Sequence, residues 1–179
     1  MNKSEIKALV ASAIETKNLC RIFFKYDINY RYYFPLINSD KLFLGANEND
    51  FILDGFSIRR FCDVKKAEIK NDKYLEIIKT EGILERMQTP QIDITDWYSV
   101  FSSLSNVDFN IIVERESLVD DECEFVIGKI EKVFKSKVIF KHFDADGIWQ
   151  AECYEIPFSQ ITSVTFASRY VDIFSKYVW

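Results

Sequence analysis

The sequence is poor in the residues on which most enzyme sites depend. It has one histidine, His142, and four cysteines that stand far apart and form no C-x-x-C pair. The usual ligand sets for zinc are therefore missing. Five glycines leave little room for a phosphate-binding loop, and with three prolines they exclude collagen-like and Pro/Gly-rich chains. We expect no cofactor, no metal and no catalytic residue, so the chain is predicted not to be an enzyme.

Long apolar runs are also missing. No stretch approaches the roughly 18 to 20 apolar residues that a membrane-spanning helix needs. The N-terminal segment carries charges of both signs and lacks the apolar core of a secretory signal. We therefore expect a cytoplasmic protein without a membrane partner, in which Cys20, Cys62, Cys123 and Cys153 are reduced thiols. Three of these are expected to lie in strands and to pack as small apolar residues.

The overall composition is that of a folded chain. Of 179 residues 48% are apolar and 16% aromatic, which excludes disorder and fits one domain or two small ones. The net charge of −5 argues against a non-specific nucleic-acid-binding protein. The charge is unevenly spread: residues 1–90 carry 15 basic against 13 acidic side chains, and residues 91–179 carry 8 against 15.

The first half has the pattern of a helix followed by short strands. Ser4 is a plausible N-cap for a helix over 4–18, because apolar residues recur there at helical spacing. Strand-like runs follow at 20–26, 30–37, 41–44, 51–53 and 58–64, with Asn, Asp and Gly between them. One leading helix and closely spaced strands favour a small barrel over a βαβ unit.

The second half repeats this order. A helix is expected from Thr95-Asp96, then strands at 109–113, 124–133 and 138–140, with the last ones near Ile156 and Ile161. Residues 138–140 match 42–44, and Tyr170 matches Tyr74, both 96 positions apart. The Asp-Gly pairs at 54–55 and 146–147 are interpreted as equivalent turns. We therefore predict an internal duplication, with units 1–89 and 90–179.

The helix-and-strand order, Gly128 within a long strand and the Asp-Gly turns resemble the plan of Sm-like barrels, a branch of the SH3-like barrels. The expected fold is mostly β with helices: two tandem Sm-like barrels, each preceded by a helix, as in a bacterial protein of this type. The run Arg31-Tyr32-Tyr33-Phe34-Pro35 is similar to the second strand of bacterial WYL domains, although their Trp-Tyr-Leu tripeptide is absent. That likeness would imply a small-molecule sensor with a pocket near Arg31.

Two patterns resemble chemical sites, but each has a simpler structural explanation. His142 could pair with Cys153 across a hairpin, but a partly exposed strand histidine beside a turn explains the pattern better. Asp144-Ala145-Asp146-Gly147 resembles the opening of a calcium loop, but its glycine falls at the fourth place rather than the sixth, and a hairpin turn explains it.

Basic residues form the clearest candidate binding features. Lys135, Lys137 and Lys141 lie in a lysine-rich strip, with Lys137 and Lys141 on one strand face, and Arg59-Arg60 stand near aromatic residues in the first half. Such features could contact RNA or single-stranded nucleic acid, or could merely keep an edge strand soluble.

The leading functional prediction is a non-enzymatic binding or assembly module that acts through protein–protein contacts, including contacts with a second copy. The first alternative is nucleic-acid binding through the lysine strip and Arg59-Arg60. The second is a small-molecule sensor. The sequence does not identify the partner.

Overall fold

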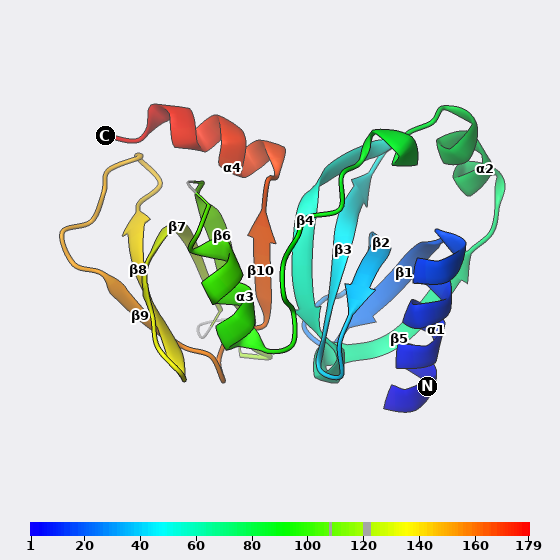
Figure 1. Cartoon of the computed structure of the whole chain (residues 1–179), viewed down its shortest axis with the longest axis horizontal. Helices are drawn as coiled ribbons and strands as arrows, with labels where there is room; N and C mark the ends of the chain where they lie inside the picture. The colour runs from blue at the N-terminus through cyan, green and yellow to red at the C-terminus, as the bar shows by residue number, and fades with distance from the viewer. Residues whose placement is uncertain (108, 120–122) are drawn as a thin grey trace. The chain divides into compact units, whose positions relative to one another are not determined.

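The computed structural model describes residues 1–107, 109–119 and 123–179. The chain divides into two compact units, Met1–Pro90 and Gln91–Trp179. Both are built mostly of β-strands, as predicted, and in each the chain runs from a helix through the strands to a further helix (Figure 1). Each unit is described by itself.

The first unit is an antiparallel sheet with helices on both of its faces. Its strands are β1 (Leu19–Phe24), β2 (Tyr30–Asn38), β3 (Leu42–Asn49), β4 (Ile52–Arg60) and β5 (Val64–Lys70), paired in the order β5-β1-β2-β3-β4. The helices are α1 (Lys3–Thr16) and α2 (Lys73–Thr80), with short 3-10 turns η1 (Phe61–Asp63) and η2 (Leu84–Arg86). The fifth strand thus returns to pair with the first.

Helix α1 covers one face of this sheet. Its N-cap is Asn2 rather than Ser4, because Asn2 and Glu5 exchange side-chain-to-backbone hydrogen bonds in a capping box. The apolar stripe of α1 packs on the side chains of β1 that point towards it. This cluster is made of Ile6, Val10, Ala13, Cys20, Ile22, Phe24, Tyr33, Phe43, Phe61, Val64 and Ala67.

Helix α2 covers the opposite face. Leu75 and Ile78 of α2 are fully buried against Leu19, Phe34 and Ala46 of the sheet. Alternation along β1 explains this division, because Leu19 and Cys20 are neighbours that point to opposite faces. The first unit therefore has two apolar layers, one on each side of a single sheet.

The last two strands of the first unit differ from the prediction. Residues 52–60 form one strand, and the fifth strand begins only at Val64, after η1. Asp54-Gly55 was predicted to be a turn, and this is wrong: both residues lie within β4, where Gly55 has φ 69. A register shift on the facing strand β3, between Ala46 and Glu48, accompanies this irregular stretch. The turn itself lies at Asp50-Phe51.

A buried ion cluster closes the corner between β4 and β5. The Asp63 carboxylate is fully buried and accepts from Arg60 Nε at 2.6 Å and from Lys25 Nζ at 2.8 Å. Burial by itself would raise the pKa of Asp63, but hydrogen bonds from Arg60 and Lys25 outweigh it and hold the pKa below its ordinary value. The ionised carboxylate at the end of η1 therefore links Arg60, the last residue of β4, to Lys25, which follows β1.

The second unit has the same order of elements. Its strands are β6 (Ile111–Arg115), β7 (Glu124–Val133), β8 (Lys137–Phe143), β9 (Tyr154–Pro157) and β10 (Ser163–Phe166), paired in the order β10-β6-β7-β8-β9. Its helices are α3 (Trp97–Leu104) and α4 (Arg169–Phe174), followed by the 3-10 turn η4 (Ser175–Tyr177). In both units, then, the fifth strand pairs with the first and a helix follows it.

Helix caps mark the equivalent helices of the two units. Asp72 caps α2 and Ser168 caps α4, each by accepting a backbone hydrogen bond three residues later. Tyr74 and Tyr170, which the sequence comparison matched, are each the second residue of their helix. The turn at Asp146-Gly147 lies between β8 and β9, so its equivalent in the first unit is Asp50-Phe51.

The sheets are open rather than closed. Within the described ranges, β5 pairs only with β1, and no pairing joins it to β4; likewise β9 ends the pairing order of the second unit. The predicted closed barrels are therefore not observed. None of the helices in these ranges has the length and apolar character that a bilayer crossing requires.

The cysteines are free thiols, but most do not lie where the pattern suggested. Cys20 alone among them lies in a strand and is buried, and burial raises its pKa to about 12. Cys62, Cys123 and Cys153 are exposed in short connections. The expectation that three cysteines pack in strands is wrong.

Candidate functional site

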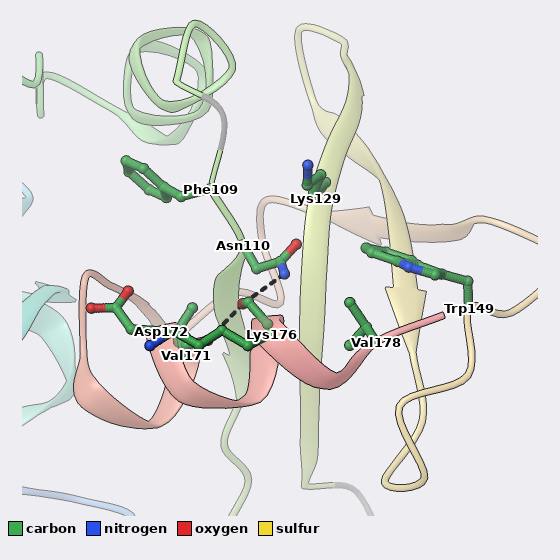
Figure 2. Close-up of a pocket in the computed structure, with 9 residues that line it drawn as sticks. Phe109, Asn110, Lys129, Trp149, Val171, Asp172, Lys176 and Val178 are labelled. Atoms are coloured by element: carbon green, nitrogen blue, oxygen red, sulfur yellow. Dashed lines mark hydrogen bonds between the residues drawn. The ribbon is translucent and has the colours of Figure 1, made fainter.

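A cavity of about 640 Å³ opens in the second unit beside α4. Its wall comes from the start of β6, from β7, from the loop after β8 and from the chain between α4 and Val178. The side chains that line it are Phe109, Asn110, Lys129, Trp149, Val171, Asp172, Ser175, Lys176 and Val178. Figure 2 shows that Phe109 and Trp149 lie on opposite sides of Asn110 in this view. The cavity thus combines aromatic, cationic and anionic side chains around one buried amide.

Asn110 is the buried polar group of this cavity, with 4% of its surface exposed. Its Nδ2 donates to Ser175 Oγ at 2.7 Å, and Ser175 Oγ donates its only proton to the Val171 carbonyl at 2.6 Å. Ser175 must therefore accept from Asn110, and this fixes which end of the amide is nitrogen. The other end, Oδ1, is buried and has no hydrogen-bond partner.

The direction of the free amide oxygen is visible in the structure. In Figure 2 the amide nitrogen lies along the dashed hydrogen bond, and the oxygen turns away from it towards Lys129 and Trp149. A buried acceptor without a donor costs about 1–3 kcal/mol. A ligand or a water molecule that donates to Oδ1 from the cavity would recover this energy.

The chain after α4 is held in place by backbone pairing. Trp179 N donates to the Gly147 carbonyl at 3.0 Å, and Trp149 N donates to the Trp179 carbonyl at 3.3 Å. Gly147 has φ 78, and a Cβ atom there would stand 2.7 Å from the Tyr177 carbonyl oxygen. Only glycine therefore allows this close approach, which brings Val178 and Trp149 to the cavity wall.

Aromatic packing fixes the Trp149 ring. Its centroid lies 5.1 Å from that of Phe143, edge to face, and Phe143 makes a similar contact with Phe174 of α4 at 5.2 Å. Asp172 and Lys176, four residues apart at the C-terminal side, are exposed at the rim. The cavity therefore offers a fixed aromatic wall, an inner acceptor and outer charges of both signs.

The cavity lining contains hydrogen-bonding, charged and aromatic side chains. Among the side chains lining the cavity there is no cysteine or histidine, and Asp172 is their one carboxylate. Within the described ranges, no three His, Cys, Asp or Glu side chains gather closely enough to hold a metal ion. A nucleophile activated by a neighbouring base is not assembled around the cavity.

The predicted arginine sites are engaged in contacts within the first unit. Arg31 donates twice to the Asp27 carboxylate, at 2.8 and 3.0 Å. Arg59 is completely buried, with its guanidinium 3.9 Å from the centre of the Phe24 ring. Arg60 holds Asp63. Arg59 therefore presents no surface to a nucleic acid.

The three predicted lysines lie on β8 and on the hairpin before it. Lys137 pairs with Glu155 at 2.8 Å, and Lys141 donates to the Gln150 carbonyl at 2.6 Å. Lys135 is exposed at the tip of the β7–β8 hairpin. The register confirms that Lys137, Ile139 and Lys141 share one face of β8.

The opposite face of β8 carries a polar cluster that the sequence did not indicate. Arg115 and Tyr154 both bind the Glu124 carboxylate, and Arg115 Nη2 donates to Tyr154 Oη at 2.9 Å. The His142 ring lies edge to face with Tyr154, 5.8 Å between centroids. Because these side chains come from different strands, only the folded chain brings them together.

The loop that begins at Asp144, whose sequence resembles the opening of a calcium loop, is stabilised by its own hydrogen bonds. Asp144 Oδ1 accepts from the backbone N–H groups of Asp146 and Ile148, both at 3.0 Å, and Oδ2 accepts from Gln150 Nε2 at 2.8 Å. This is an Asx-type turn, in which the carboxylate closes the loop. The turn brings Gly147 to the chain after α4.

Comparison with known proteins adds no family. Neither protein-family models nor curated proteins nor solved structures match this chain. Asn110 was missed by the sequence analysis because it fell within the strand predicted at 109–113, whereas β6 begins only at Ile111, and a single asparagine beside apolar residues does not indicate a buried amide.

Proposed function

We propose that this chain is a non-enzymatic binding module whose second unit takes a small polar ligand into the cavity beside α4. The observation that carries this proposal is the buried Oδ1 of Asn110, which has no partner in the protein. The sequence analysis placed a possible small-molecule pocket near Arg31. We propose instead that the small-molecule site lies at Asn110.

Comparison of the two units argues against a purely structural role for Asn110. Leu19 is its counterpart: Leu19 begins β1 and Asn110 directly precedes β6, and each is buried on the face covered by the helix that follows the fifth strand. Leu19 is fully buried and apolar. Since the first unit packs this position with leucine, the fold does not demand an amide here.

The lining of the cavity specifies a class of ligand. An N–H or O–H group is needed to reach Asn110 Oδ1, and a planar ring would pack against Trp149. Asp172 and Lys176 at the rim suit a molecule that also carries charged or strongly polar groups. A small aromatic or heterocyclic compound with a hydrogen-bond donor fits all three features.

The test is the variant Asn110→Leu, which copies the first unit. A thermal-shift screen of donor-bearing aromatic and heterocyclic compounds identifies a ligand for the wild-type chain, and calorimetry measures its Kd. We expect Asn110→Leu to raise Tm by about 2–4 °C, because roughly 1 kcal/mol of unsatisfied polarity is removed. The same variant should weaken ligand binding at least about tenfold.

Asn106→Leu is the matched control, since Asn106 is exposed just after α3 and its side-chain amide donates to the Ser102 carbonyl. It should leave the ligand Kd unchanged. If Asn110→Leu lowers Tm, or binds the ligand as well as the wild type, the amide serves the fold and the proposal is wrong.

The finer fold prediction also remains our proposal: each unit derives from a Sm-like barrel led by a helix, and the two arose by duplication. Its support is the shared pairing of the fifth strand with the first, and the equivalent positions of Tyr74 and Tyr170. A cytoplasmic location fits the free thiols, and detection of reduced Cys62, Cys123 and Cys153 in cells would test it.

A further inference from the structure

Two hairpin tips of opposite charge stand out on the surface. The acidic tip, residues 47–54, joins β3 to β4 and has three carboxylates and no basic side chain. The basic tip, residues 132–137, joins β7 to β8 and has three lysines and no carboxylate. Each tip thus has the sign opposite to the net charge of the half that carries it.

The acidic tip holds an aromatic residue in an unfavourable backbone conformation. Asp50 has φ 48 and Phe51 has φ 67, and for a bulky side chain such left-handed values cost about 1–2 kcal/mol. Asp-Gly is the usual pair in such a tight turn. The backbone N–H of Phe51 is held by Glu48 Oε1 at 2.8 Å and by Tyr74 Oη at 3.0 Å.

The contacts around Phe51 leave it partly uncovered. Its ring stacks on Tyr74 with centroids 4.3 Å apart, yet 39% of Phe51 and 54% of Ile52 are exposed. Tyr74 Oη also donates to Glu48 Oε1 at 2.6 Å, and burial together with this bond raises the pKa of Tyr74 to about 12. The tip is therefore an ordered apolar surface and not a loose loop.

A buried carboxylate beneath the acidic tip has one oxygen without a hydrogen-bond partner. Glu48 is 7% exposed, and while its Oε1 accepts two hydrogen bonds, its Oε2 has no partner. A buried carboxylate oxygen without a donor is expensive, and a cation is its best partner. The exposed Asp50 beside it adds to the attraction for a basic group.

The basic tip has complementary features. Phe134 is 38% exposed, and the ammonium groups of Lys132 and Lys137 lie 5.0 and 5.5 Å from its ring centre. Phe134 N donates to the Lys137 carbonyl at 2.9 Å and closes the turn, and Lys135 is exposed at its apex. The basic tip is thus an apolar ring surrounded by cations.

We propose that the acidic tip of one copy binds the basic tip of a second copy. Phe134 would pack against Phe51 and Ile52, and Lys132 and Lys135 would face Asp50 and the Glu48 carboxylate beneath it. Lys137 already pairs with Glu155. The contact joins unlike surfaces, one from the first unit of one copy and one from the second unit of the other. Two hairpin tips form a small interface, so the association is weak and depends strongly on salt.

The experiment is sedimentation equilibrium of the chain, with and without nuclease treatment, at 0.05 and 0.5 M salt. We expect a concentration-dependent rise in mass at low salt that disappears at high salt. Asp50→Lys and Lys135→Glu should each weaken association at least about tenfold, because each replaces attraction by repulsion. The left-handed backbone at residue 50 accepts lysine, since Lys17 adopts φ 50 in this chain.

The decisive measurement is an equimolar mixture of these two single variants. In the mixture the intact basic tip of the Asp50→Lys chain meets the intact acidic tip of the Lys135→Glu chain, so association that neither variant shows alone should be recovered. A monomer at every concentration, or variants that associate like the wild type, would overturn the proposal. Association that nuclease treatment abolishes would assign the basic tip to nucleic acid instead.

A third variant separates binding from folding. Phe51→Gly removes the strained aromatic residue and supplies the preferred turn residue, so Tm should fall little or rise while self-association is lost. If Phe51→Gly unfolds the first unit yet the charge variants behave as the wild type, Phe51 is a packing residue only. The proposal does not depend on the cavity, because Asn110→Leu should leave self-association unchanged.

Discussion

The two units share a strand order but use the helix after the fifth strand differently. In the first unit α2 inserts Leu75 and Ile78 into a continuous apolar layer on the sheet. In the second, α4 is shorter and contributes Val171 to a smaller cluster, and the space beside it is the cavity. The comparison teaches that one topology yields either a filled layer or a binding cavity, depending on a few side chains under one helix.

The largest effect is expected from the buried ion cluster of the first unit. Asp63→Ala leaves Arg60 and Lys25 without their shared carboxylate and should cost about 4 kcal/mol in the free energy of unfolding. The counterpart for comparison is Glu124→Ala in the second unit, where the carboxylate is 35% exposed and the cost should be about 1 kcal/mol or less. Urea denaturation of both variants measures the difference. Equal losses of unfolding free energy in the two variants would contradict the predicted difference between the buried and the partly exposed carboxylate.

The acid sensitivity of the first unit follows from the same carboxylate. The folded state lowers the pKa of Asp63 below its ordinary value of 3.8, so its stabilisation is complete above that value. The stabilisation is lost as the pH falls from 3.8 through the lower folded pKa. Denaturation from pH 2 to pH 6 should therefore show a smaller acid-dependent loss for Asp63→Asn than for the wild type.

The next largest effect should come from exchanging the residue that distinguishes the two helix-covered faces. Leu19→Asn puts an amide into the apolar layer under α2, where no serine equivalent to Ser175 receives it, and should destabilise the first unit by about 3 kcal/mol. Circular dichroism during urea unfolding measures this loss. If Leu19→Asn is tolerated, the layer is less tightly packed than the burial of Leu19 indicates.

The smallest effect concerns the wall of the cavity. Gly147→Ala adds a Cβ that meets the Tyr177 carbonyl in a left-handed backbone region, so it should cost about 1–2 kcal/mol and displace the segment at Val178. Trp149 fluorescence and ligand affinity should change together. Gly82→Ala, at φ 63 but with no neighbouring atom nearer than 3.5 Å, is the matched control for backbone strain alone.

The sequence predicted the elements well where their periodicity was strong. The strand at 124–133 has the predicted bounds, and the helix-first order of each half was found. It failed at Asp54-Gly55, because an Asp-Gly pair within a strand is indistinguishable from one in a turn until the register is known. Ser4 and Asn2 are both good caps, and only the bond between Asn2 and Glu5 decides between them.

The candidate site was much harder to predict than the fold. Its members come from the start of β6, from β7, from the loop after β8 and from the chain after α4, so no local pattern links them. The signal lies in a comparison of the units: a leucine at position 19 and an asparagine at position 110 occupy equivalent buried places. Recognising that equivalence requires the register of both sheets. Arg59 was predicted to be a binding residue but is buried against Phe24. The Arg59-Arg60 pair in the sequence gives no sign of that burial.

The four thiols provide a means of observing the first unit alone. Cys20 lies beneath α1 and, with its pKa raised to about 12 by burial, resists alkylation while the unit is closed. Cys62, Cys123 and Cys153 are accessible from the start. The fourth label to be incorporated is therefore the one on Cys20, and its rate reports how often α1 separates from the sheet. Spectroscopic signals that average over both units would not isolate this local opening.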